Sequence, residues 1–449
     1  MKRILFGILT GVTTIQPLAL HAHDSERTEK PNIIFFLVDD LNYQSLGYVG
    51  NKIVQTPNID RLANNGCIFN NAFVTTSISM ASRASLFTGK YMCNHGVTQY
   101  LTPMPLKKTK EVYPKVLKNN GYESAFTGKF GFKIENGASP SGWFDYYRPV
   151  DRPPMIWTDS TGVERHTTGV ITDNALEFIK TRNRNKPFCL SISYHASHAE
   201  DNDHTPGRGH YPYMKERSDY YKNDVIPIPE LMNDSVFGLL PDFLKKSMNR
   251  ERYFWRWDTP EKYQENVKSY YRMITDIDES VKKVCSLLKK EGIDKNTVII
   301  FMSDNGYFMG ERGLAGKWIH FEESLRVPMF IYDPRVSNKN RHISSDEMVL
   351  NVDIPSTILQ FAGVETPDSY QGKSLVNIVN GVRDDNFREE FYCEHGSTVK
   401  SIPRWRGVRT DRYVYAHYYD NNYEYLHDLK TDPKELKNFA SLTAYFINI

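Results

Sequence analysis

Apolar residues along the chain gather into short runs that are separated by amphipathic stretches. One nearly continuous run covers 32–38 and ends abruptly in two aspartates, and similar runs cover 188–194, 297–302 and 328–332. Runs of this length and composition are typical of strands that are buried on both faces of a sheet. We therefore predict that residues 32–38 form the central strand of a mostly parallel sheet.

Residues at helical spacing predict the helices between these strands. The clearest pattern ends at Glu291-Gly292 and is made of Val267, Tyr270, Ile274, Ile277, Val281, Val284 and Leu288. Further helices are expected over 80–87 and 173–179. Strands that alternate with helices favour an α/β fold with a doubly wound, mostly parallel sheet, which we assign to residues 31–383.

Two segments depart from this alternation. Residues 200–257 are rich in Tyr, Asp, Pro, Arg and His with weak periodicity, so we expect an insertion that shapes a substrate site. After about residue 384 the pattern changes to short strand-like pieces separated by turns. These pieces lie at 389–394, 405–409, 413–418 and 423–426. They predict a small antiparallel α+β subdomain over residues 384–449.

The first residues predict export. A short basic start precedes a mostly apolar run from Ile4 to Leu20, and Ala22 offers a small residue for cleavage. This is the layout of a secretory signal peptide over residues 1–22, with a buried N-terminal strand as the alternative. We expect the mature protein in the periplasm or outside the cell. No internal stretch of the sequence approaches the about 20 apolar residues of a membrane span.

Charge and cysteine content narrow the classes of function. The formal net charge is +2 over 449 residues, which gives no reason to expect a nucleic acid partner, although local basic clusters suit an anionic substrate. The cysteines show neither CxxC pairing nor the spacing of metal ligands, and they are Cys67, Cys93, Cys189, Cys285 and Cys393. We expect mostly buried free thiols, with one disulfide left open.

Acidic and amide residues follow two of the predicted strands. Asp39 and Asp40 come directly after the run at 32–38, and Asp304 and Asn305 follow the run at 297–302. Open α/β sheets bind ligands at the carboxyl ends of their strands. Hard oxygen ligands suit Ca²⁺ or Mg²⁺ rather than zinc. Either pair alone is more often a turn or a helix cap, but their joint occurrence after matching strands favours a metal site.

The most specific motif covers residues 79–90, with the sequence SMASRASLFTGK. It resembles the signature of the type I, formylglycine-dependent sulfatases of the alkaline phosphatase-like superfamily. That signature is Cys or Ser, any residue, Pro or Ala, any residue, Arg, then a short apolar stretch and Thr-Gly-Lys/Arg. A polar helix N-terminus with serine caps is the simpler alternative.

The resemblance implies a modified nucleophile and a metal ion. Ser79 would be oxidised to formylglycine (3-oxoalanine) by a sulfatase-maturating enzyme, as in serine-type bacterial members. The formylglycine would be a further ligand of Ca²⁺, with Mg²⁺ less favoured. A serine hydroxyl needs a base to become nucleophilic, whereas a hydrated aldehyde offers one hydroxyl to attack sulfur and another to expel sulfate. Arg83, one helical turn beyond Ser79, would stabilise the charge of the hydrate.

Three further residues match the family's sulfate-binding positions: Lys129 in Thr-Gly-Lys, His198 in Ser-His-Ala and Lys317 in Gly-Lys-Trp. The resemblance implies that these side chains neutralise the sulfate and the charge that develops during its displacement. His198 or Lys317 would protonate the leaving alcohol. Taken singly, each is more simply explained as a solvated lysine or a hydrogen-bonded loop histidine.

One position departs from the family pattern. Members often carry a histidine two residues after the lysine that Lys129 matches, where it is thought to act as a base on the hydrate. This chain has Gly131 there, and His95 is a candidate substitute. The motifs otherwise follow the family order from about Pro31 to Phe439.

Together these patterns predict an enzyme that removes sulfate from a sulfated polysaccharide or oligosaccharide. Aromatic rings stack on sugars, and basic side chains pair with sulfates. The candidate sugar contacts are Arg208, His210, Arg404 and Arg406. Two alternatives stay open. One is a phosphodiesterase or phosphonate hydrolase of the same superfamily, and the other is a protein that binds sulfated glycans without hydrolysing them.

Overall fold

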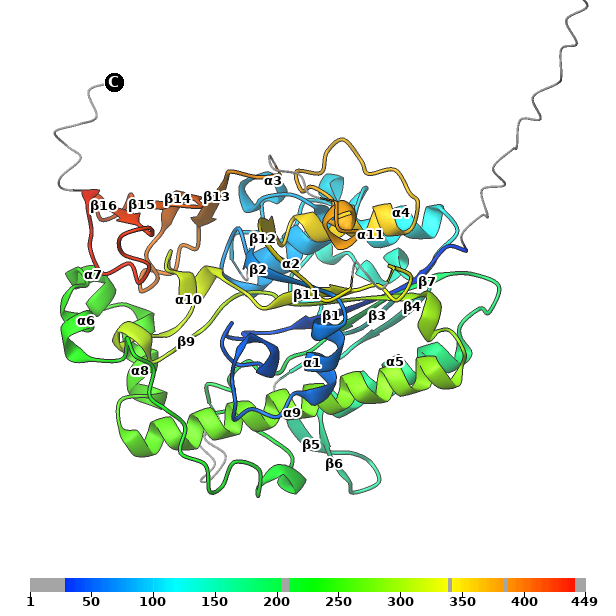
Figure 1. The fold of residues 1–449 in the computed structure, drawn as a ribbon, viewed down its shortest axis with the longest axis horizontal. Helices are drawn as coiled ribbons and strands as arrows, with labels where there is room; N and C mark the ends of the chain where they lie inside the picture. Colours follow the sequence, from blue (N-terminus) through cyan, green and yellow to red (C-terminus); the bar gives the residue numbers. More distant parts are fainter. Residues whose placement is uncertain are drawn as a thin grey trace, which may run out of the picture.

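A central sheet lies between two layers of helices in the computed structural model of the chain (Figure 1). The structure describes residues 29–99, 101–152, 154–202, 210–337, 341–382 and 387–440. The predicted signal peptide lies outside these residues. No helix of the described part is long and apolar enough to cross a membrane.

The central sheet has eight strands in the order β12-β2-β11-β8-β1-β7-β3-β4. The strands are β1 (Asn32–Val38), β2 (Cys67–Phe73), β3 (Glu123–Gly128), β4 (Tyr146–Pro149), β7 (Phe188–Ser193), β8 (Thr297–Ser303), β11 (Met329–Tyr332) and β12 (Ile343–Leu350). β1 pairs in parallel with β8 on one side and β7 on the other. β11 is antiparallel to both its neighbours. The sheet is therefore mostly parallel, and the prediction that β1 is a central strand is confirmed.

Helices cover both faces of this sheet. Successive side chains of β1 point to opposite faces, so each face presents apolar side chains that a layer of helices buries. Phe35 packs in the core under α2 (Ser79–Thr88), α4 (Tyr113–Asn119) and α11 (Asp353–Phe361), whereas Phe36 packs in the core on the other face. That second core lies under α1 (Pro57–Asn64), α5 (Thr167–Thr181) and α9 (Pro260–Lys290). The two helical layers are visible above and below the sheet in Figure 1. The doubly wound fold is thus confirmed.

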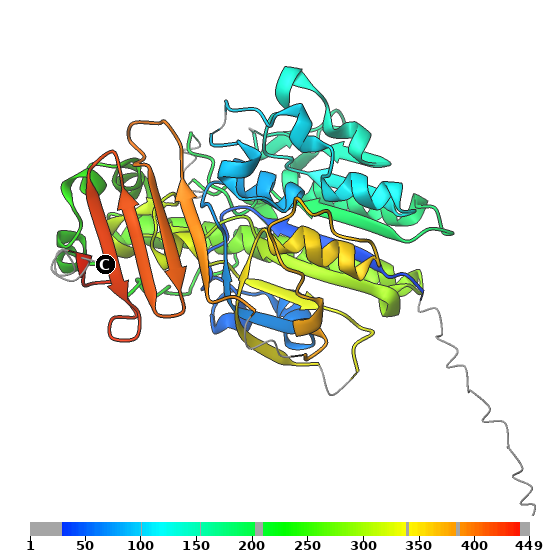
Figure 2. The ribbon, with the colours of Figure 1, turned by 90° about the horizontal axis from the view of Figure 1, so that it is seen from above.

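A second sheet lies at one end of the molecule, as Figure 2 shows. Its four strands are antiparallel in chain order: β13 (Glu390–His395), β14 (Trp405–Thr410), β15 (Tyr413–Tyr418) and β16 (Tyr423–Asp428). Each falls on a predicted strand-like piece. Trp405 Nε1 donates to the carbonyl of Trp318 at 2.7 Å, which joins this sheet to the main body. The boundary predicted at residue 384 lies outside the described residues and stays a prediction.

The described part of the predicted insertion contains three short helices, α6 (Asp234–Gly238), α7 (Asp242–Lys245) and α8 (Met248–Arg256). α8 packs beside the two-stranded sheet of β9 (Phe308–Met309) and β10 (Ala315–Gly316). The remaining elements are β5 (Ile156–Thr158), β6 (Glu164–His166), α3 (Met92–His95), α10 (Glu322–Leu325) and α12 (Val376–Val379). Single 3-10 turns occur at Gly47–Val49, Leu106–Thr109, Glu135–Gly137, Pro140–Trp143, Lys215–Arg217, Asp294–Asn296 and Glu311–Gly313. All five cysteines are free, and three of them are buried.

Candidate active site

The carboxyl ends of β1 and β8 meet because the two strands are parallel neighbours. Asp304 N donates to the carbonyl of Val38 at 2.9 Å, and Asp40 N donates to Asp304 Oδ1 at 3.2 Å. Asn305 Nδ2 donates to Asp40 Oδ1 at 2.7 Å. Asp39, Asp40, Asp304 and Asn305 are each no more than 1% exposed. The four predicted metal ligands thus lie in one buried cluster.

Ser79 is the first residue of α2 and faces this cluster. Its Oγ lies 2.8 Å from Asp39 Oδ1 and 3.2 Å from Asn305 Oδ1. It also accepts a hydrogen bond from Lys317 Nζ at 2.9 Å. An N-terminal helix end carries a partial positive charge that favours an anion. A side chain at position 79 is therefore surrounded by carboxylate, amide and ammonium groups.

Three cations compensate the buried carboxylates. Arg83 Nε forms an ion pair with Asp304 Oδ2 at 2.8 Å, and its Nη1 donates to the carbonyl of Lys129 at 2.9 Å. Lys129 Nζ contacts Asp39 Oδ2, and Lys317 Nζ contacts Asp40 Oδ1. The sequence predicts Lys129 and Lys317 at the sulfate and Arg83 at the charge of the hydrate. Lys317 Nζ contacts Ser79 Oγ, while Arg83 and Lys129 contact carboxylates of the same cluster.

Burial and charge act in opposite directions on these groups. Burial would raise the pKa of Asp39, but Lys129 and other nearby cations hold that pKa well below its usual range. Burial and the neighbouring Asp39 raise the pKa of Asp304 to about 6. Burial lowers the pKa of Lys129 to about 8, against the attraction of Asp39. Strong, opposed perturbations of this kind are typical of functional sites.

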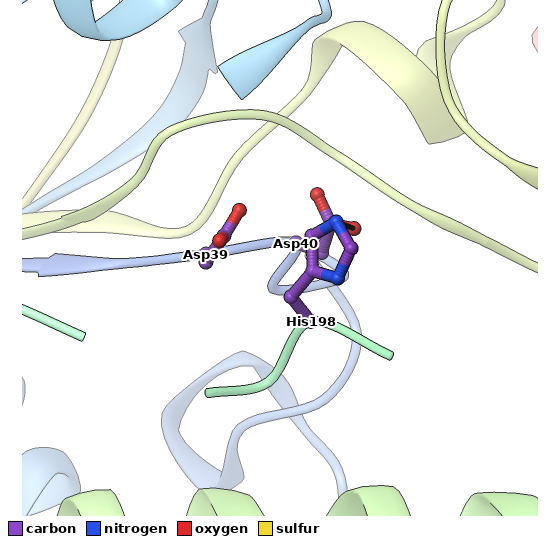
Figure 3. A group of neighbouring side chains, drawn as sticks. All are labelled: Asp39, Asp40 and His198. Carbon is purple, nitrogen blue, oxygen red and sulfur yellow. Dashed lines mark ion pairs between the residues drawn. The ribbon is translucent and has the colours of Figure 1, made fainter. Parts of the chain in front are cut away.

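His198 reaches the cluster from the loop after β7, with its ring beside Asp40 (Figure 3). Its Nε2 lies 3.6 Å from Asp40 Oδ2, and its Nδ1 lies 2.6 Å from the carbonyl of Ala199. A carbonyl accepts only, so Nδ1 carries a proton and donates. Burial and the guanidinium of Arg152 lower the pKa of His198 well below its ordinary value. Nη2 of that guanidinium lies 3.2 Å from His198 Nε2.

The donor set fits a hard divalent cation. Asp40 Oδ2 is buried and has no hydrogen-bond partner among the described residues. Ligand atoms of Asp39, Asp40 and His198 lie within 4.8 Å of one another. An unpartnered buried carboxylate oxygen among further carboxylate and amide oxygens is what Ca²⁺ or Mg²⁺ requires.

One residue of the site was missed from the sequence. Tyr270, on α9, donates from its hydroxyl to the carbonyl of Asp40 and accepts from Asn42 N, each at 2.8 Å. It therefore fixes the backbone around Asp40, which has a positive φ of 55°. The helical pattern places Tyr270 on the buried face, where its hydroxyl requires a partner. A buried tyrosine hydroxyl in the predicted helix was therefore the sequence feature that could have indicated Tyr270.

Several sequence candidates lie apart from residue 79. The ring nitrogens of His95 lie 3.1 Å from Ser85 Oγ and 3.1 Å from Val97 N, so both are engaged away from the nucleophile. Arg404 forms a two-point ion pair with Asp420 at 2.7 and 2.6 Å. The other suggested sugar contacts stay predictions: Arg208 lies outside the described residues, His210 is buried, and Arg406 is on β14 of the second sheet.

Comparison with known proteins assigns the chain to a family. The sulfatase family model matches residues 31–364, and a model named "N-sulphoglucosamine sulphohydrolase, C-terminal" matches residues 310–446. The N-acetylglucosamine-6-O-sulfatase of Bacteroides thetaiotaomicron is 29% identical, over 94% of this chain and 84% of the relative. The arylsulfatase of Clostridium perfringens is 28% identical, over 93% of this chain and 91% of the relative.

A solved structure resembles the fold over nearly its whole length. It is a protein in complex with its substrate D-glucosamine-2-N,6-O-disulfate, with a TM-score of 0.77 and 26% identity. The similarity covers 93% of this chain and 95% of that chain. With the family model matching most of the sequence, this chain belongs to the sulfatase family and is a sulfatase enzyme.

Proposed function

We propose that this sulfatase removes sulfate from a sulfated carbohydrate by means of a formylglycine at position 79 and a bound Ca²⁺. The observation that carries the proposal is the position of Ser79 Oγ, which lies 2.8 Å from Asp39 Oδ1 and 2.9 Å from Lys317 Nζ. A nucleophile placed between metal-type oxygen ligands and an ammonium group can receive a sulfate and stabilise its charge.

Oxidation of residue 79 to an aldehyde would supply a hydrate with two hydroxyls, one to attack sulfur and one through which sulfate is later released. Arg83, held by Asp304, faces position 79 from the next turn of α2 and would stabilise negative charge on the hydrate. Asp39 accepts the hydrogen bond of the residue 79 hydroxyl and orients it. A maturating enzyme is the partner that this oxidation requires.

Asp39, Asp40, Asp304 and Asn305 would hold the Ca²⁺, together with residue 79. A divalent cation there would offset the three buried carboxylates and lower the pKa of an attacking hydroxyl. Asp40 Oδ2, which has no hydrogen-bond partner among the described residues, is the oxygen with free capacity for such a ligand bond.

Lys129, Lys317 and His198 would bind the sulfate and assist the departure of the alcohol. Lys129 Nζ contacts Asp39 and Lys317 Nζ contacts Asp40 of the cluster. Their ammonium groups can share the negative charge that builds on the sulfate oxygens during an in-line displacement. His198 Nε2, near Asp40, and Lys317 Nζ are the two candidates to protonate the leaving oxygen.

The relatives support a carbohydrate substrate, since one is named for a sulfated amino sugar and another is bound to one. Two relatives are named extracellular sulfatases, which is consistent with the export that we infer from residues 1–22. The chain would then meet sulfated glycans outside the cytoplasm.

Release of inorganic sulfate from a panel of sulfated saccharides tests this proposal. The protein is co-expressed with a maturating enzyme, and aryl phosphate and phosphonate esters are measured beside the sulfates. We expect sulfate release from wild type and from the control Ser85→Ala, and none from Ser79→Ala. Faster turnover of the phosphorus esters would favour a phosphohydrolase. Tight binding without release, in protein confirmed to carry formylglycine, would favour a glycan-binding protein.

A further inference from the structure

Arg152 lies against the catalytic cluster without a carboxylate partner. Its Nη2 lies 3.2 Å from His198 Nε2, and its Nη1 donates to the carbonyl of Ala199 at 3.2 Å. Among the described residues no Asp or Glu forms an ion pair with it. The half-buried guanidinium has five N–H donors, and its two contacts are with neutral groups. N–H donors therefore remain for an anionic acceptor.

Two further arginines share one carboxylate near the loop that carries His198. Asp201 accepts from Arg252 Nη2 at 2.7 Å and forms an ion pair with Arg256 as well. The side chain of Arg256 is 0% exposed, and its Nε and Nη1 have no hydrogen-bond partner among the described residues. Arg252 Nε is also buried without one. One carboxylate therefore serves two guanidinium groups and satisfies neither fully.

α8 packs against the backbone of the segment that carries Lys317. Asn249, one turn earlier on α8, donates from Nδ2 to the carbonyls of Ala315 and Lys317 at 2.9 and 2.7 Å. The Arg252 guanidinium lies 4.8 Å from the ring centre of Trp318, the residue after Lys317. Arg152 thus contacts His198, and Arg252 contacts the residue that follows Lys317.

Around Asp201, the described side chains carry more guanidinium groups than carboxylates. Three guanidinium groups face Asp201, and the nearby Glu200 adds one further carboxylate, which accepts from Met155 N at 2.9 Å. Arg152 contributes, with Arg252 and Arg256, to the lowered pKa of Asp201, so all three lie within electrostatic range of it. Buried cations in excess of their partners are costly. A planar oxyanion offers paired acceptors that match the guanidinium fork.

We propose that Arg152 and Arg252 form a subsite for a second anionic group of the substrate, beside the sulfate that is hydrolysed. The substrate class is then a saccharide that carries a further sulfate or a carboxylate on the same or the adjoining sugar. This inference rests on the proposed function, since it assigns the subsite to the leaving-group side of the same site.

Matched saccharides test the subsite. Three compounds share the scissile sulfate, and one carries nothing further, one a second sulfate, and one a carboxylate. Their binding to protein that retains an unoxidised Ser79 is measured by calorimetry, and their kcat/KM is measured with mature enzyme. We expect at least one of the two doubly anionic compounds to bind about tenfold tighter than the singly sulfated one. The better of the two identifies the second group.

Charge-removing variants complete the experiment. Arg152→Gln and Arg252→Gln should each reduce this preference about tenfold, whereas Arg252→Lys should retain part of it. Arg148→Gln removes an exposed arginine four residues from Arg152 and should leave the preference intact. Equal binding of all three compounds to wild type, or an unchanged preference in both Gln variants, overturns the subsite. Absence of sulfate release from every compound would instead contradict the proposed function. The calorimetric binding preference would still test the subsite in that case.

Discussion

Gly131 packs directly against the side chain of Arg83. A Cβ atom at position 131 would lie 2.4 Å from Arg83 Cδ, and the backbone there has a φ of +99°. Both features exclude an ordinary side chain. The family pattern often has a histidine at this position, but here the aliphatic part of Arg83 occupies the space that such a side chain would need. The departure is therefore built into the packing of the site.

Gly131→Ala should reduce turnover strongly, because the new methyl group must displace Arg83 from Asp304. We expect kcat/KM to fall about 100-fold, as for loss of one positioned charge-stabilising group. Gly121→Ala is the matched control, since its φ is +87° but nothing lies within 4 Å of its Cβ position. It should lower the melting temperature by strain alone and leave kcat/KM near wild type. Equal activity of Gly131→Ala and Gly121→Ala would contradict this role for the contact.

Tyr270→Phe should weaken catalysis while leaving the core packed. The hydroxyl bonds both the carbonyl of Asp40 and the amide of Asn42, so its loss frees the loop that carries Asp40. We expect the free energy of unfolding to fall by about 1–3 kcal/mol and kcat to fall about tenfold. Tyr271→Phe is the control, since the hydroxyl it removes accepts from Asn51 Nδ2 at 2.8 Å. If both variants lose the same activity, Tyr270 does not position Asp40.

Asp40→Asn should weaken Ca²⁺ binding, because it removes a charge from the proposed ligand set. We expect calorimetry with CaCl₂ to show the dissociation constant rise at least about tenfold. Chelation should lower the melting temperature of wild type and leave that of the variant almost unchanged. Asp278→Asn alters another buried aspartate, one that bonds Asn58 and Ile59, and should bind Ca²⁺ like wild type. Undiminished Ca²⁺ affinity in Asp40→Asn would place the ion elsewhere.

Much of this arrangement could be predicted from the sequence, because β1 and β8 are buried on both faces and each ends in acidic or amide residues. The direction of β11 could not, since a short apolar run has the same pattern in a parallel or an antiparallel strand. β2, β3, β4 and β12 were not predicted, and in β4 the residues are half-buried or exposed at the sheet edge. The positions of Arg152 and Tyr270 depend on contacts between distant segments, for which local periodicity carries no signal.

Stability should fall as the pH rises, in part because of Glu311. Burial, with a contribution from Glu323, raises the pKa of Glu311 from 4.5 to about 7. The folded protein then binds more protons than the unfolded chain between these values, so the free energy of unfolding decreases as pH rises through that window. Glu311→Gln retains an oxygen for Met309 N, which donates to Glu311 at 2.5 Å. It should therefore be more stable than wild type at pH 8, by on the order of 2 kcal/mol.

Urea unfolding at pH 5 and pH 8 measures this difference. Glu279→Gln, which alters a partly exposed glutamate of α9, serves as the control and should follow the wild-type pH dependence. A pH dependence in Glu311→Gln as steep as in wild type would show that Glu311 is not the responsible group.

The mass of the peptide that contains residue 79 tests the central claim most directly. In protein co-expressed with a maturating enzyme, we predict a peptide lighter than the serine form by two hydrogen atoms. The rate of sulfate release across preparations should rise in proportion to the fraction of that lighter peptide. Full sulfatase activity in a preparation whose residue 79 is wholly unmodified serine would contradict the account.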